Sequence, residues 1–170
     1  NGIGVGKDRL DKAMDYGIKN FSISLDSLYP ERFDYICEKE GSWDEAVTSI
    51  THIGQRLAGV AGAMPTINCV VSNLNLEELP DMVRFAKDVG FAISFLPIEL
   101  LENKTDGVRN WEARFIRYRP EMGLHTNDSA KAIHDRVDRA YEQLIQMKQD
   151  GWPILNSSPY LKSSQQYLKT

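Results

Sequence analysis

The chain has 170 residues, 42% hydrophobic and 26% charged, as in an ordinary globular protein with one domain and a real core. Its net charge of −4, with lysine and arginine scattered along the chain, argues against a nucleic-acid partner. No apolar run could span a bilayer and no secretory signal opens the chain, so we expect no membrane partner either.

The first half of the chain alternates between helical and strand patterns. Residues 7–16 place their apolar side chains on one helical face. Residues 21–26 alternate strictly between apolar and polar, as in a strand with one buried face. Pro30 suits the first turn of a short helix. Ser42 opens the spacing of a capping box, which predicts a helix through Leu57.

The alternation continues through the middle of the chain. A second strand is predicted at 66–71, Asn75 begins a second capping arrangement and its helix, and a third strand follows at 91–97. Such an order calls for parallel strands joined by right-handed crossovers. Polar residues near the strands' C-terminal ends favour a barrel over an open sheet, whose strands would be apolar throughout.

We therefore expect an α/β fold, a partial TIM-like (βα) barrel truncated at its N-terminus. The chain begins with Asn1 rather than Met, just before a helical pattern, which suggests a fragment. The expected divisions are a partial barrel at 1–101, a loop or insertion at 102–128 with a short helix near 110–118, the last barrel helix at 129–151, and a tail at 152–170 that holds a short strand at 152–155 and leads to a missing C-terminal region.

The two cysteines, Cys37 and Cys69, form neither a CxxC pair nor a metal-binding spacing. Both fall in segments predicted to be ordered. We therefore expect unpaired thiols and a reducing, cytoplasmic location.

Three segments resemble the radical S-adenosylmethionine (radical SAM) superfamily. Its fourth barrel strand and next helix resemble ISLDSLYPERFDYI, its fifth strand, loop and helix resemble PTINCVVSNLNLEELPDMVRFAKDVG, and its sixth strand resembles FAISFLPIE. The resemblance is strongest to the branch that holds the molybdenum-cofactor cyclase and the peptide-modifying enzymes with a C-terminal auxiliary-cluster domain. The tail segment ILNSSPYL resembles the approach to that extra domain.

The resemblance implies an enzyme that binds S-adenosylmethionine. With a [4Fe–4S] cluster it would generate a 5′-deoxyadenosyl radical that abstracts hydrogen from a peptide or small molecule. Such a cluster needs cysteine thiolates, in this family usually as CxxxCxxC, and the chain contains no such run. The resemblance places it upstream of Asn1, so we expect this chain to bind no metal and to be inactive alone.

Polar positions on the first two strands are the candidate cofactor ligands. The resemblance assigns Ser24 to the ribose and methionine ends of S-adenosylmethionine, with Asp26 nearer the strand end. Thr66 stands where the family often has Lys or Arg, so Asn68, which offers both a donor and an acceptor, is the better candidate. Two alternatives stay open: Asp26 and Ser27 cap the following turn, or these residues line a barrel without a ligand.

The third strand ends in Leu96 and Pro97, where the family holds the adenine with backbone and apolar groups; such residues are also common in cores. Glu99 could face the substrate, and Glu102 is a weaker candidate. The histidines show no metal-ligand spacing and are expected at the surface or at helix edges: His52, His125 and His134. No catalytic residue is assigned.

Two other classes of function remain open at this point. The chain could be a degenerate, non-catalytic α/β domain kept for binding or assembly. It could also belong to an ordinary TIM-type lyase that uses Asp26 or Glu99 for acid–base chemistry.

Overall fold

Three parallel strands form the centre of the protein. The computed structural model describes residues 6–98 and 130–169. The sheet has the order β1 (Ser22–Ser24), β2 (Thr66–Val71), β3 (Ala92–Pro97), and both neighbouring pairs are parallel. The parallel α/β order predicted from the alternating patterns is therefore confirmed.

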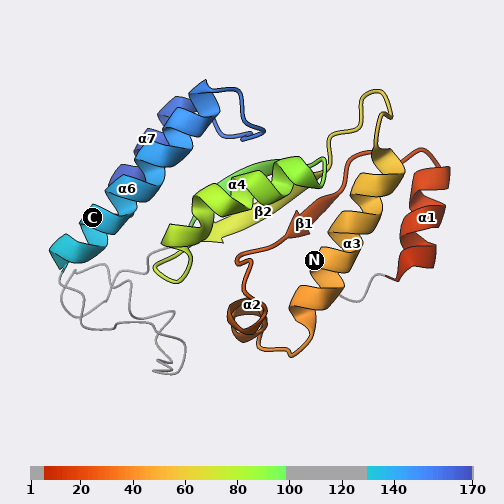
Figure 1. Cartoon of the computed structure of the whole chain (residues 1–170), viewed down its shortest axis with the longest axis horizontal. Coiled ribbons are helices and arrows are strands. Elements are labelled where there is room, and N and C mark those ends of the chain that lie inside the picture. The colour runs from red at the N-terminus through yellow and green to blue at the C-terminus, as the bar shows by residue number, and fades with distance from the viewer. Residues whose placement is uncertain (1–5, 99–129, 170) are drawn as a thin grey trace.

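Helices connect and flank these strands. Figure 1 shows α1 beside α3 and α7 beside α6, in agreement with their contacts. The described helices are α1 (Lys7–Asp15), α2 (Pro30–Cys37), α3 (Ser42–Leu57), the 3-10 turn η1 (Leu76–Glu78), α4 (Leu79–Asp88), α6 (Ala130–Gln149) and α7 (Ser158–Tyr167). None of the described helices is long and apolar enough to cross a membrane.

The two faces of the sheet differ in character. One face packs with α3, α4 and α6 into a single core and consists of buried residues: Ile23, Leu25, Ile67, Cys69, Val71, Ile93 and Phe95. The other, here called the open face, consists of half-buried or exposed residues: Ser22, Ser24, Asp26, Thr66, Asn68, Val70, Ala92, Ser94 and Leu96. Strict alternation along the strands produces both faces at once.

The tail contributes a rudimentary fourth strand. Its predicted strand at 152–155 is reduced to one parallel bridge between Ile154 and Ile93. The side chain of Asn156 then continues the ladder: its Oδ1 accepts the Phe95 N–H at 2.7 Å, and its Nδ2 donates to the Phe95 carbonyl at 3.0 Å. A side-chain amide thus takes the place of a peptide group at this edge.

The predicted capping box at Ser42 is wrong. Gly41 is the N-cap of α3 and makes no side-chain cap hydrogen bond. Instead, the carboxylate of Asp34, in the preceding helix, accepts the N–H groups of Gly41 at 2.7 Å and Trp43 at 2.8 Å. A carboxylate is a stronger acceptor than a serine hydroxyl at the positive end of a helix, and Ser42 becomes the first, buried residue of α3.

Several sequence predictions lie outside the described residues. These are the loop at 102–128 with its short helix, and the residues Glu99, Glu102 and His125. Closure of the sheet into a barrel and the division of the chain into domains stay predictions.

Candidate functional site

Nearly all the predicted cofactor ligands share the open face. The register places Ser24, Asn68 and Ser94 side by side on adjacent strands, and Val70 beside Leu96. Asp26 and Thr66 lie on the same face, beyond the end of β1 and at the start of β2. Pro97 differs: it pairs with Val71, whose side chain enters the core, so alternation places Pro97 on the other face.

Ser24 and Asn68 retain unused hydrogen-bonding capacity. Asn68 Nδ2 donates to Ser22 Oγ at 2.6 Å, and within residues 6–98 and 130–169 its Oδ1 accepts no hydrogen bond. The hydroxyl of Ser24 has no hydrogen-bond partner in the same part of the chain. Thr66 instead donates to the Met64 carbonyl at 3.4 Å. The centre of the open face therefore offers a donor and acceptors to a ligand.

Asp26 is engaged with the neighbouring strand. The Leu25 N–H donates to the Asn68 carbonyl at 3.0 Å, a regular rung between β1 and β2. At the next rung the Val70 N–H donates to Asp26 Oδ1 at 2.7 Å, so a carboxylate takes the place of a backbone carbonyl. Burial raises the pKa of Asp26, and the Val70 hydrogen bond offsets part of that increase.

The predicted turn-capping role is only half correct. Ser27 Oγ accepts the Tyr29 N–H at 3.0 Å, as expected for a serine before a helix. The side chain of Asp26 bonds to Val70 instead.

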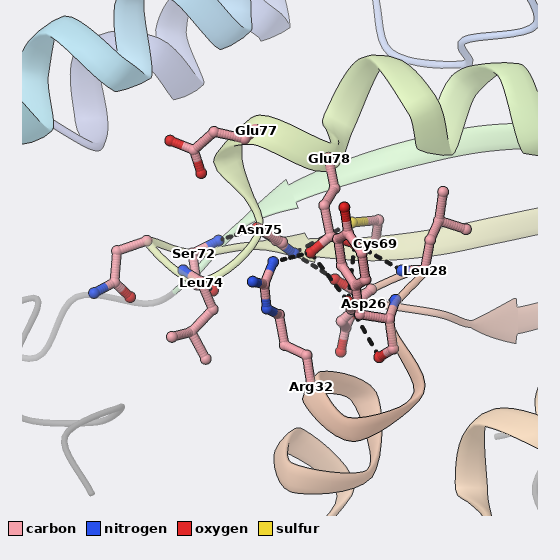
Figure 2. Close-up of polar contacts among 12 residues, drawn as sticks. Asp26, Leu28, Arg32, Cys69, Ser72, Leu74, Asn75, Glu77 and Glu78 are labelled. Atoms are coloured by element: carbon pink, nitrogen blue, oxygen red, sulfur yellow. Dashed lines mark hydrogen bonds and ion pairs between the residues drawn. The ribbon is translucent and has the colours of Figure 1, made fainter. Parts of the chain in front are cut away.

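Asn75 joins the ends of the first two strands, a role that the sequence did not indicate. Its buried Nδ2 donates to the carbonyls of Asp26 at 2.7 Å and Val70 at 2.8 Å, while its Oδ1 accepts the Ser72 N–H at 2.9 Å (Figure 2). The predicted capping role of Asn75 is wrong, since its side chain makes no cap hydrogen bond. The amide of Asn75 instead satisfies two backbone carbonyls, which would otherwise need another donor.

Glu78 fixes the loop between β1 and α2. Its carboxylate, 5% exposed, accepts the Ser27 hydroxyl at 2.9 Å and the Leu28 N–H at 2.7 Å, and it pairs with the guanidinium of Arg32 (Figure 2). Together, Asn75 and Glu78 attach the segment after β2 to the segment after β1. They hold the C-terminal ends of these strands, where Asp26 lies, in a fixed position.

Replacement of Asn75 by alanine is expected to reduce the free energy of unfolding by about 1–3 kcal/mol, because buried backbone groups lose their partners. The matched control is Asn73→Ala, since Oδ1 of Asn73 is buried without a hydrogen-bond partner in the described part of the chain. Urea denaturation of both variants gives the comparison. Equal losses would show that the amide of Asn75 has no special role.

The described residues contain no cluster of His, Cys, Asp and Glu that could hold a metal ion. His52 bonds through Nε2 to Asp11 Oδ1 at 2.9 Å and thereby links α3 to α1. Both cysteines are free thiols, as predicted. Cys69 is fully buried in the core, and burial raises its pKa well above the ordinary value. His134 lies half-buried in α6.

Comparisons with known proteins give relatives of one kind. The chain is 26% identical to molybdenum cofactor biosynthesis protein 1 of Drosophila melanogaster over 144 residues, which are 84% of this chain and 20% of that protein. It is 28% identical to GTP 3′,8-cyclase 1 of Mycobacterium tuberculosis over 138 residues, 74% of this chain and 36% of that enzyme. It is 33% identical to the GTP 3′,8-cyclase of Nautilia profundicola over 113 residues, which are 65% of this chain and 33% of that enzyme.

The chain thus spans between a fifth and about a third of the length of these relatives. No protein-family model matches it, and no solved structure matches it significantly.

These relatives confirm the resemblance to the radical SAM superfamily, and the parallel βα order agrees with it. The relatives are GTP 3′,8-cyclases and a molybdenum cofactor biosynthesis protein, to which the chain is similar at low identity and over part of their length. Radical SAM enzymes of the molybdenum-cofactor branch use S-adenosylmethionine and [4Fe–4S] clusters, the cofactors that the resemblance implied.

Proposed function

We propose that this chain is part of a radical SAM enzyme and that its open face is one wall of the S-adenosylmethionine site inside a βα barrel. The observation that carries the proposal is the position of Ser24 and Asn68, in register on adjacent strands with unused hydrogen-bonding capacity. The ribose hydroxyls and the amine of S-adenosylmethionine are groups that a serine hydroxyl and an amide can bind. The residues of the open face therefore fit this cofactor.

Each part of the face would have its own role. Ser24 and Asn68 would orient the ribose or methionine end, with Asp26 at the strand end and Thr66 at the strand start. Leu96, on the same face, would pack against the adenine. Pro97, whose side chain lies on the other face, would contact the adenine only through its backbone.

The described residues do not fit an iron–sulfur cluster, because Cys69 faces the core and Cys37 lies in α2. We therefore expect the cluster ligands, which supply reductive cleavage of S-adenosylmethionine, in residues outside this chain. The relatives named for GTP support a small-molecule substrate rather than a peptide. The cytoplasmic location and the domain divisions at 1–101, 102–128, 129–151 and 152–170 belong to the same proposal.

One alternative loses support from the structure. A lyase that uses Asp26 for acid–base chemistry would need that carboxylate free to approach its substrate. Asp26 Oδ1 instead accepts the Val70 N–H and so links the end of β1 to β2.

The test uses the whole polypeptide from the open reading frame that contains this chain. After anaerobic reconstitution with iron and sulfide, reduction in the presence of S-adenosylmethionine should release 5′-deoxyadenosine. The upstream sequence should contain CxxxCxxC. A start codon directly before Asn1, or a cluster-loaded protein that leaves S-adenosylmethionine intact, would refute the proposal.

A further inference from the structure

Five backbone N–H groups at the C-terminal ends of β1 and β2 donate to side chains of the chain itself. Phosphate-binding loops and helix N-termini work by leaving such groups free for an anion. Here the acceptors are side chains of the same region, two of them carboxylates. The occupied N–H groups are those of Leu28 (by Glu78), Tyr29 (by Ser27), Val70 (by Asp26), Ser72 (by Asn75) and Leu74 (by Ser72).

The open face also lacks positive charge. None of its nine described residues is Lys or Arg, and Asp26 is its only ionisable group. The nearby guanidinium of Arg32 pairs with Glu78 and lies over the Tyr29 ring, 5.0 Å from its centroid. Arg136 is bound to Glu77 and to the Asn73 carbonyl.

A nucleoside triphosphate needs the opposite arrangement. Its several negative charges are recognised by Arg or Lys and by free N–H groups. A face with one carboxylate and neutral hydroxyl and amide groups would repel a polyphosphate, whereas it suits hydroxyl, amide or ammonium groups.

We propose that the open face is specific for neutral or positively charged ligand groups, and that the substrate held against it carries no polyphosphate. This deepens the proposed function and rests on it, since the face must first be a ligand site. S-adenosylmethionine, with its sulfonium and ammonium charges, belongs to the accepted class. GTP, for which the relatives are named, does not.

The test measures equilibrium binding of S-adenosylmethionine, guanosine and GTP to the reconstituted full-length protein. The wild type should bind S-adenosylmethionine saturably and should bind GTP no more tightly than guanosine. Thr66→Lys adds a cation to the open face and should raise GTP affinity about tenfold, the gain of a charge-assisted hydrogen bond. Thr48→Lys, on the exposed side of α3, is the matched control and should leave the affinity for GTP unchanged.

A second variant keeps the test independent of how Thr66→Lys folds. Asp26→Asn removes the only carboxylate of the face, and GTP affinity should rise. Tighter binding of GTP than of guanosine by the wild type, or no gain in either variant, would overturn the inference. Saturable binding of S-adenosylmethionine in those samples would leave the proposed function standing. Failure of the wild type to bind S-adenosylmethionine would overturn the proposed function and this inference with it.

Discussion

Replacement of Glu78 by alanine is expected to lower the free energy of unfolding by about 3–5 kcal/mol, the cost of breaking a buried ion pair on one side. The variant leaves the guanidinium of Arg32, the hydroxyl of Ser27 and the N–H of Leu28 without their acceptor. All three belong to the segment after β1, so that segment should also lose its fixed position. Chemical denaturation measures the stability.

Glu77 provides the matched control for this experiment. Its carboxylate is 61% exposed and pairs with Arg136 at 2.5 Å, and a pair of that kind contributes about 0–1 kcal/mol. Glu77→Ala should therefore lose far less stability than Glu78→Ala. Glu78→Gln keeps the shape of the side chain and removes its charge, and it should fall between the two. Similar losses at Glu77 and Glu78 would contradict the role given to the buried carboxylate.

Gly54→Ala is expected to destabilise the protein by about 1–3 kcal/mol or more, as overpacking does. An alanine Cβ at this position would lie 2.0 Å from the carbonyl oxygen of Val89 and 3.2 Å from its carbonyl carbon. Backbone atoms at the end of α4 would have to move, or α3 would shift away from α4. The same substitution in an unobstructed helix would stabilise it by about 1 kcal/mol.

The stability change expected for Gly54→Ala is opposite in sign to the change expected in an unobstructed helix, so the prediction is easy to test. Thermal or urea unfolding should place Gly54→Ala below the wild type. Gln55→Ala, at the next and exposed position of α3, should match the wild type or exceed it slightly. A stabilised Gly54→Ala variant would show that α3 and α4 do not approach this closely.

The element order could be predicted because the chain's periodicity is strong. Ile23 and Ile67 alternate with polar neighbours, Ile93 lies between Ala92 and Ser94, and all three isoleucines enter the core. The same alternation placed Ser24 and Asn68 together on the other face. The strand–helix order predicted that their strands are parallel, but the register that places the two residues side by side is known only from the structure.

The polar contacts could not be predicted because they join residues far apart in sequence. The amide of Asn75 reaches Asp26, 49 positions away, and Glu78 reaches Leu28, 50 positions away. A local pattern shows which side chains can cap a helix, but it does not rank them against distant acceptors. For this reason the capping role of Asn75 was wrong. At Ser42 the competing group is nearer, the carboxylate of Asp34 in the preceding helix. The helices that follow Asn75 and Ser42 were correct.

The tail is a second region in which a local sequence pattern did not predict the contacts. The pattern at 152–155 predicted a strand, but only Ile154 forms a bridge. Asn156 supplies the next rung through its side chain, which no periodicity indicates.

The most direct test of the central proposal is the affinity of the reconstituted full-length protein for S-adenosylmethionine with Asn68 replaced by alanine. If Asn68 binds the cofactor, the loss should be about 1–3 kcal/mol, or roughly 5- to 150-fold in Kd. Asn20→Ala, which removes a hydrogen bond to the Met64 N–H before the strands begin, should bind like the wild type. An unchanged Kd in Asn68→Ala would contradict the assignment of the open face to the cofactor.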